Sequence, residues 1–170
     1  MYRLGILTIS DKGARGERRS DMSGEAIKES LSLIADSYVA KYEIVPDEKD
    51  IIAKKLAGWA DEGSVDAILT TGGTGLSKRD VTPEATMSIL DKVIPGFGEA
   101  MRAKTFSFTP MAMLSRAVAG VRKECLIINL PGSPEAVQQC LSVVLPVVPH
   151  AIEIIRGDVT EHQMSHGGED

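Results

Sequence analysis

The sequence is poor in cysteine and aromatic residues, and it carries no excess of basic charge. It has two cysteines, Cys125 and Cys140, and an aromatic content of 4%. Two cysteines do not make the disulfide framework of a small secreted protein, and both lie in apolar patterns, so we expect core thiols. A net charge of −5 argues against nonspecific nucleic-acid binding, which usually needs a basic face. We therefore expect no nucleic-acid partner.

Long hydrophobic runs are also missing. The longest apolar run, Val143 to Val148, is interrupted by Pro146 and is far shorter than the roughly 20 residues that span a bilayer. The residues after Met1 enter a strand-like pattern directly, without the charged and apolar regions of a secretory signal. These features predict a cytoplasmic protein that does not bind a membrane.

What is present is an alternation of strand and helix patterns. Apolar runs without strict alternation are typical of strands buried on both faces of a parallel sheet, and amphipathic helical patterns lie between them. The pattern predicts an α/β fold, a three-layer α/β/α sandwich with a mostly parallel central sheet. We assign residues 1–157 to a single domain and expect a polar, disordered tail over 158–170. The predicted strands are Tyr2 to Ile9, Tyr42 to Val45, Ala67 to Thr70 and Leu126 to Leu130.

Proline and glycine divide the second half of the chain. Pro95-Gly96-Phe97-Gly98 is expected to break the helix that begins at Pro83. Pro146 and Pro149 are expected to kink or break the helix predicted from Pro134 to Ile155. Three methionines of this half are expected to pack in the core, with a subunit interface as the second interpretation. They are Met101, Met111 and Met113.

The most informative segment runs from Thr70 to Ala85. The strand before it leads into a loop with Gly72, Gly73 and Gly75, and a helix begins near Pro83. Glycines let the backbone turn tightly and approach a ligand, and exposed N–H groups beside a helix N-terminus attract anions. Asp80 lies between the loop and the helix, where a carboxylate can hold a divalent metal against a phosphate. The segment predicts a site for a nucleotide or a phosphoester.

The same segment also fits a plain connection between strand and helix. Thr82 would then be the N-cap, Pro83 the first helical residue, and Glu84 an acid that compensates the helix dipole. The spacing matches neither the Walker A loop nor the dinucleotide fingerprint, because Lys78 lies three residues after Gly75. If the loop binds phosphate, it does so in another geometry.

Two further junctions have a related composition. Asn129 to Ala136 again places glycine, a hydroxyl N-cap, proline and glutamate in order after a strand, and Thr8-Ile9-Ser10-Asp11 ends the first strand. Ligands of open α/β sheets bind at the carboxyl ends of strands near a topological switch point. We expect these loops to face one cleft.

These motifs together resemble the molybdopterin adenylyltransferases of molybdenum-cofactor synthesis, which include the bacterial Mog-type proteins and the G domain of gephyrin. The resemblance is carried by the glycine loop with Arg79-Asp80-Val81-Thr82-Pro83-Glu84-Ala85, by Pro95 to Glu99, by Ala112 to Arg116 and by Ile128 to Pro134. It covers about residues 4 to 156. It implies a homotrimer of three-layer α/β domains that transfers AMP from ATP to the terminal phosphate of molybdopterin and releases pyrophosphate.

The family motifs also imply roles for individual residues. Asp47 and Asp80 match the carboxylates that hold Mg²⁺, and Ser115 matches an active-site serine. The binding residues implied for the nucleotide and the pterin are Ser10, Asp11, Thr71, Gly72, Gly73, Thr74, Gly75, Arg79, Pro131, Gly132, Ser133 and Pro134. Structural alternatives remain for the three catalytic candidates: Asp47 as a helix cap, Asp80 as a cap of the Pro83 helix or a partner of Arg79, and Ser115 as a satisfied helix hydroxyl.

Two functions follow from the resemblance. The first is the ATP-dependent enzyme, which would hand its product to a separate molybdate-insertion protein. The alternative is a non-catalytic carrier or scaffold that binds molybdopterin without adenylating it. Retention of both Asp47 and Asp80 favours the enzyme, because a pterin carrier does not need a pair of metal-holding carboxylates. His162 and His166 stand four residues apart in the polar tail, where a solvated tail is favoured over a metal site.

Overall fold

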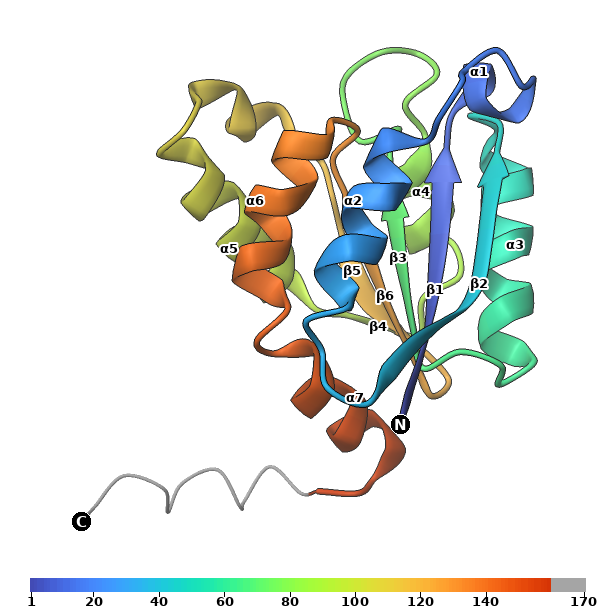
Figure 1. The fold of residues 1–170 in the computed structure, drawn as a ribbon, viewed down its shortest axis with the longest axis vertical. Coiled ribbons are helices and arrows are strands. Elements are labelled where there is room, and N and C mark those ends of the chain that lie inside the picture. Colours follow the sequence, from blue (N-terminus) through green and yellow to red (C-terminus); the bar gives the residue numbers. More distant parts are fainter. Residues whose placement is uncertain (160–170) are drawn as a thin grey trace.

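The protein, described here from a computed structural model over residues 1–159, is a three-layer α/β/α sandwich (Figure 1). This confirms the predicted fold class. The predicted tail with His162 and His166 lies almost wholly outside the described residues. The elements in chain order are β1 (Tyr2–Ile9), α1 (Asp11–Ala14), α2 (Met22–Leu31), β2 (Ser37–Val45), α3 (Lys49–Asp61), β3 (Ala67–Thr71), α4 (Thr82–Met87), β4 (Lys92–Val93), α5 (Pro95–Phe106), the 3₁₀ helix η1 (Pro110–Leu114), β5 (Ala119–Arg122), β6 (Cys125–Leu130), α6 (Pro134–Val144) and α7 (Val148–Arg156).

The central sheet has the strand order β2-β1-β3-β6-β5-β4. The four neighbouring strands β2, β1, β3 and β6 run parallel, as predicted. Strand β5 pairs antiparallel with both β6 and β4. The sequence pattern did not reveal β4 and β5, because a two-residue and a four-residue strand carry too little hydrophobic periodicity. The mostly parallel character of the sheet is nonetheless confirmed.

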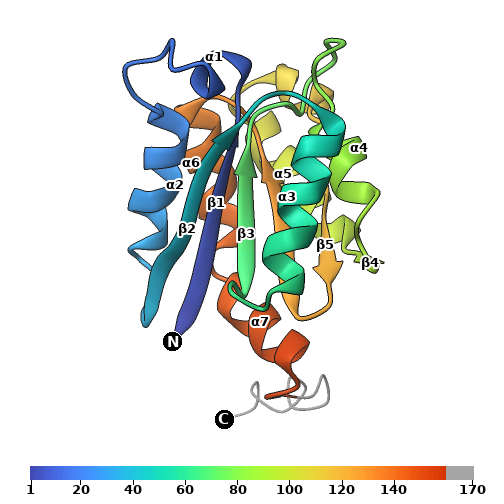
Figure 2. The same ribbon diagram turned by 90° about the vertical axis from the view of Figure 1, so that its right-hand side faces the viewer.

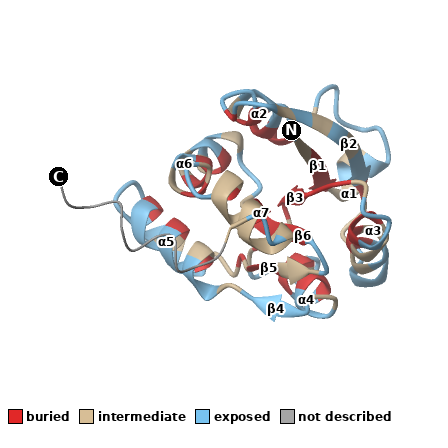
Figure 3. Ribbon diagram, turned by 90° about the horizontal axis from the view of Figure 1, so that it is seen from below, coloured by how far each residue is buried: buried red, intermediate tan, exposed pale blue. Residues whose placement is uncertain are grey.

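Each face of the sheet has its own apolar core. Leu4 and Ile6 of β1 pack with α2, α6 and α7 on one face, and Leu7 and Ile9 pack with α3 and α4 on the other. This alternation follows from the two-residue period of side chains along a strand. The red, inward-facing sides of the helices in Figure 3 follow the same division, and Figure 2 shows the layers edge-on. Cys125 and Cys140 are free and buried, which confirms their prediction as core thiols.

The second half of the chain contains one error of prediction and one success. The segment Pro95 to Gly98 does not break a helix: α4 has already ended at Met87, and Pro95 lies in the first turn of α5, where its missing N–H costs nothing. The predicted break near Pro146 is correct, because α6 ends at Val144 and α7 begins at Val148. Within the described residues no single helix is long and apolar enough to cross a membrane, and α6 and α7 reach that length only together, across a 59° bend.

The methionines divide between core and surface. Met101 is buried in the core on α5, as predicted. Met111 and Met113 are 62% and 67% exposed on η1, so core packing was the wrong interpretation for these two. They lie beside the exposed Phe106 and Phe108, which leaves an apolar surface at this end of the molecule.

Candidate functional site

The strand order places a topological switch point between β1 and β3. From β1 the chain passes through α2 to β2 on one side, and then through α3 back to β3 on the other side of β1. The connection after β1 therefore leads to β2 on one side, whereas the connection after β3 leads through α4 to β4, β5 and β6 on the other side. The two loops part at the carboxyl ends of β1 and β3. In Figure 1 this edge is at the top, where α1 and the loop after β3 lie. The predicted site residues lie along this edge and the neighbouring end of β6.

The loop after β3 requires glycine at two positions. Gly72 and Gly73 have φ values of +97° and +68°, which L-residues with side chains rarely adopt. A Cβ on Gly72 would collide with the carbonyl oxygen of Ile9, and one on Gly73 with the hydroxyl of Thr82. The loop therefore passes directly against the end of β1, with no space for side chains.

Thr82 fastens this loop, and its predicted role as the N-cap of the following helix is wrong. It is the first residue of α4, after Val81. Its hydroxyl donates to the carbonyl oxygen of Gly72 at 2.9 Å, and its amide donates to that of Gly73 at 3.1 Å. The side chain is completely buried, so both bonds are shielded from water. The hydroxyl that the sequence suggested for capping instead sets the conformation of the glycine loop.

Asp11 and Asp47 join the ends of β1 and β2 through a reciprocal pair of hydrogen bonds. The amide of Asp11 donates to Asp47 Oδ2 at 2.9 Å, and the amide of Asp47 donates to Asp11 Oδ1 at 3.0 Å. Arg79 crosses from the glycine loop and donates to both oxygens of Asp11, at 3.0 and 2.8 Å. These bonds from Arg79 lower the pKa of Asp11. Three predicted site residues are thus brought into direct contact.

The alternative role of Asp47 as a helix cap is not observed, since Glu48 occupies the N-cap of α3 and makes no side-chain capping bond. Burial raises the pKa of Asp47, and the negative charges of Asp11 and Asp80 raise it further against the hydrogen bond from the Asp11 amide. Burial and the two neighbouring carboxylates thus disfavour a negative charge on Asp47, and a cation bound here would offset this. This environment of Asp47 is the feature of the structure that fits a divalent metal.

Asp80 lies at the far end of the glycine loop from Asp47, near Gly75. Its Oδ2 accepts a hydrogen bond from the amide of Ser77 at 2.9 Å, and a Cβ on Gly75 would lie 2.9 Å from the same oxygen. It neither caps α4 nor pairs with Arg79, so both alternatives are wrong. A Cβ on Gly73 would lie 3.3 Å from Asp47 Oδ1. The two carboxylates therefore flank the loop, one at Gly73 and the other at Gly75.

The loop after β6 lies directly beside the glycine loop. Thr71 donates its hydroxyl to the carbonyl oxygen of Pro131 at 2.6 Å, and the amide of Gly72 donates to that of Leu130 at 3.3 Å. Ser133 caps α6 as predicted, accepting from the amide of Ala136 at 3.2 Å, with Pro134 in the first turn. Two further predicted residues have structural roles: Ser10 caps α1, and the Gly132 carbonyl accepts from Ser23.

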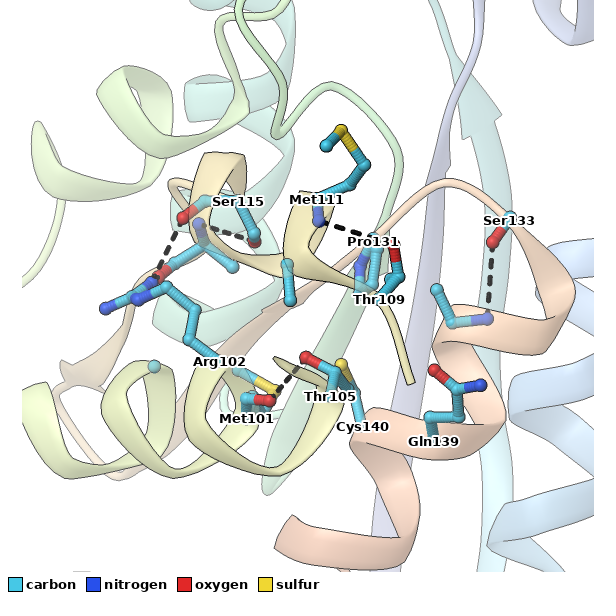
Figure 4. A pocket seen from close by; sticks show the side chains of 14 residues that line it. Met101, Arg102, Thr105, Thr109, Met111, Ser115, Pro131, Ser133, Gln139 and Cys140 are labelled. Carbon is cyan, nitrogen blue, oxygen red and sulfur yellow. Dashed lines mark hydrogen bonds between the residues drawn. The ribbon is translucent and has the colours of Figure 1, made fainter. Parts of the chain in front are cut away.

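Ser115 lies apart from the carboxylates, at a pocket between α5, η1 and α6 that we call the α5–α6 pocket. The pocket has a volume of about 260 Å³, and Pro131 and Ser133 also line it (Figure 4). Ser115 follows η1 in extended conformation, and its hydroxyl accepts a weak bond from the amide of Ala117 at 3.4 Å, so it is not a helix hydroxyl. The predicted residues therefore form two adjoining parts, the glycine loop with its carboxylates and this pocket.

Arg116 is a site residue that the sequence reasoning missed. Its Nε donates to the carbonyl oxygen of Gly75 and its Nη2 to that of Asp80, both at 2.8 Å, while Nη1 pairs with Glu84. Its backbone amide also donates to the carbonyl oxygen of Thr74, a buried residue, at 3.0 Å. The one signal in the sequence that could have identified Arg116 is its position directly after Ser115, at the end of the family motif Ala112 to Arg116. Arg116 holds the half of the glycine loop that carries Asp80.

Among residues 1–159 no group of three or more His, Cys, Asp or Glu side chains is arranged to hold a metal ion. Asp47 and Asp80 supply two carboxylates, which agrees with the way Mg²⁺ is usually bound, through one or two carboxylates with substrate phosphates and water. The donor set thus fits Mg²⁺ only when a phosphate-bearing substrate shares it.

The sequence and the fold match known proteins over most of the chain. Residues 5–150 match a family model described as "Probable molybdopterin binding domain". Molybdopterin adenylyltransferase of Helicobacter pylori J99 is 45% identical over 156 residues, covering 91% of this chain and 88% of the relative. The enzyme of the same name from Escherichia coli K12 is 38% identical, covering 94% and 88%. The crystal structure of the molybdopterin biosynthesis enzyme MoaB from Thermus thermophilus superposes with a TM-score of 0.84 at 54% identity, covering 92% of this chain and 98% of that one.

Proposed function

The chain belongs to the family of molybdopterin-binding domains, and we propose that the glycine loop and its flanking carboxylates are where it transfers an adenylyl group. The protein is an enzyme of molybdenum-cofactor biosynthesis that adenylates molybdopterin. ATP and molybdopterin are its substrates. The observation that carries the location of the site is the pair Asp47 and Asp80, held on either side of a glycine loop at the switch point of the sheet.

The reaction joins an oxygen of the terminal phosphate of molybdopterin to the α-phosphorus of ATP. The bond between the α-phosphorus and its bridging oxygen breaks, and pyrophosphate leaves with the electron pair. Because the attacking phosphate is already anionic at neutral pH, the reaction needs alignment and charge neutralisation and no strong general base. This requirement fits a site made of backbone amides, arginine and carboxylates.

The residues divide these tasks. Gly72 to Gly75 would present backbone N–H groups to the phosphates, and Arg79 would add positive charge from the same loop. Asp47 and Asp80 would hold Mg²⁺, which neutralises charge on the phosphates of ATP. Ser115, Pro131 and Ser133 line the α5–α6 pocket, where they would contact the organic part of a substrate.

The same proposal includes the setting of the enzyme. We expect a cytoplasmic homotrimer that hands adenylated molybdopterin to a separate molybdate-insertion protein. The exposed apolar side chains Phe106, Phe108, Met111 and Met113 support assembly, because an apolar surface of this kind is typical of a protein interface. Light scattering of the purified protein tests the trimer directly.

The test of function is an incubation of the purified protein with molybdopterin, ATP and Mg²⁺, in which adenylated molybdopterin and pyrophosphate are measured. The Asp80→Asn variant keeps an oxygen for the Ser77 amide but loses the charge that holds the metal, so it should give no product. Asp91→Asn is the matched control, since Asp91 also accepts a backbone amide, that of Lys123 at 2.7 Å, away from the site.

If the wild type and Asp91→Asn form product and Asp80→Asn forms none, the result would support the assignment of the site. Full activity of Asp80→Asn would exclude Asp80 as a metal ligand. Binding of molybdopterin by the wild type without any product would favour the carrier over the enzyme.

A further inference from the structure

The α5–α6 pocket has walls suited to a flat, polarisable ring. Met101 and Cys140, which line it from α5 and α6, are buried (Figure 4). The exposed Met111 of η1 and Ala136 of α6 also line the pocket. Thioether and thiol sulfurs make favourable contacts with aromatic rings, and methionine adapts its shape to them. A mostly apolar cavity with a few polar groups is the usual form of a small-molecule site.

The polar groups of the pocket are not all used within the protein. The Gln139 side-chain amide makes no hydrogen bond to any described residue, although it lies on the pocket wall (Figure 4). Arg102 donates to the carbonyl oxygens of Ser115 and Ala117 through Nη1 alone, which leaves Nε and Nη2 without an acceptor among residues 1–159. An amide offers a donor and an acceptor side by side, and this matches the edge of a nitrogen heterocycle.

The pocket holds no reactive thiol. Its one cysteine is Cys140, and burial raises the pKa of that thiol to about 11, so it stays protonated at neutral pH. Cys140 therefore contributes to the wall of the pocket and not to covalent chemistry.

Two of its wall segments are hydrogen-bonded to the glycine loop. Next to Ser115, the amide of Arg116 donates to the Thr74 carbonyl at 3.0 Å, and next to Pro131 the carbonyl of Leu130 accepts from Gly72. The pocket thus adjoins the loop on the side away from Asp11 and Asp47. A substrate that carries both groups would then have its phosphate at the loop and its ring in the adjoining pocket.

We propose that the α5–α6 pocket is the ring subsite of this enzyme, where Gln139 reads the edge of a nitrogen heterocycle whose phosphate lies at the glycine loop. The proposal rests on the proposed function. Both substrates carry such a ring, adenine in ATP and the pterin in molybdopterin, and the experiment below distinguishes them.

The experiment measures binding to the purified full chain by calorimetry for three ligands: ATP, 6-hydroxymethylpterin, and inorganic tripolyphosphate, which has no ring. Gln139→Met keeps the length of the side chain and removes the donor and the acceptor proposed to bond the ring. It should weaken one of the two ring ligands about tenfold, as expected for loss of about 1.4 kcal/mol. Affinity for tripolyphosphate should not change.

Two further variants complete the design. Gln138→Met is the matched control, because Gln138 is the neighbouring glutamine on α6, is exposed, and does not line the pocket. It should bind every ligand as the wild type does. Ala136→Phe fills the pocket from α6 and should abolish binding of the same ring ligand that Gln139→Met weakens.

A selective loss for ATP assigns the pocket to adenine, and a selective loss for 6-hydroxymethylpterin assigns it to the pterin. The proposal is overturned if the wild type binds neither ring ligand, if both variants bind both rings normally, or if tripolyphosphate is weakened equally. Adenylyl transfer is assayed separately on the wild type. Absence of transfer together with selective loss of ring binding would refute the proposed function and leave the ring subsite standing.

Discussion

Replacing Arg116 tests whether the position of the glycine loop, and not only its composition, supports transfer. Arg116 comes from the segment after η1 and touches the loop at Gly75 and Asp80 through its guanidinium group. The Arg116→Ala variant removes these bonds and the ion pair with Glu84 while leaving every proposed ligand of the substrate and metal in the sequence.

The expected magnitude follows from the contacts. Two bonds from a charged donor at 2.8 Å each would contribute about 3 kcal/mol or more if fully buried, but the Arg116 side chain is 34% exposed, so we expect a loss of about 2 kcal/mol in the free energy of unfolding. The half-exposed pair with Glu84 adds at most about 1 kcal/mol. Activity should fall further, by about a hundredfold in kcat, because a small displacement of Asp80 misaligns the phosphates.

The assay combines urea unfolding with adenylyl transfer, and Arg122→Ala is the matched control. Arg122 makes an equivalent set of bonds, to the carbonyl oxygen of Ile89 at 2.9 Å and to both oxygens of Asp61 at 2.9 and 2.7 Å, away from the glycine loop. Arg122→Ala should lose a similar amount of stability and keep its kcat. Arg116→Lys should recover part of the stability but little activity, since one ammonium group cannot replace the planar guanidinium at both carbonyls.

If Arg116→Ala and Arg122→Ala had equal kcat values, Arg116 would be a structural residue only. If kcat fell in proportion to the loss of stability in Arg116→Ala, Arg116→Lys and Arg122→Ala alike, the proposed positioning role of Arg116 would also be refuted. A specific fall in kcat in the two Arg116 variants would identify Arg116 as a positioning residue.

Three other perturbations have expected outcomes. Gly73→Val should weaken nucleotide binding at least tenfold in a calorimetric titration, since valine disfavours a φ of +68° and its Cβ would collide with Thr82; unchanged affinity would make the loop a plain connection. Burial raises the pKa of Asp66, but bonds from two arginines outweigh it and lower the value to about 2 from 3.8. The stabilisation, about 2 kcal/mol, is present above pH 4 and is lost as the pH falls toward 2; urea unfolding across this range should show it in the wild type and not in Asp66→Asn. Burial raises the pKa of Cys125 to about 12 and that of Cys140 to about 11, so neither thiol should react with a disulfide reagent at pH 8 until the protein unfolds; rapid labelling of the native protein would contradict their burial.

Local features of the site could be read from the sequence. The glycines after β3 predicted a tight loop at a strand end, and Gly72 and Gly73 do adopt positive φ values. The order of hydroxyl, proline and glutamate predicted the start of α6, which Ser133 caps. Such features depend on the backbone preferences of a few consecutive residues, and these are properties of the sequence itself.

Equally local reasoning failed where a tertiary contact competed with it. Thr82 is a residue type that often caps helices, yet its hydroxyl donates to the Gly72 carbonyl oxygen because the glycine loop folds back against the start of α4. Residue type alone predicts Pro95 to be a helix breaker, yet it begins α5, because proline is disfavoured inside a helix and favoured in its first turn. In both cases the residue type allowed two outcomes and its neighbours in space selected one.

Periodicity and residue type along the chain are enough to predict the alternating elements, the glycine loop and the charged residues at the strand ends. The contacts of Asp11 with Asp47 and Arg79 arise only on folding. The same holds for the bonds by which Arg116 holds the half of the loop that carries Asp80, and for the place of Gln139 in the wall of the pocket. The hydrogen-bonded partners among these residues are between 36 and 68 positions apart in the chain. Their meeting depends on the order of strands in the sheet, which is set by the packing of two apolar cores and not by any local run of residues.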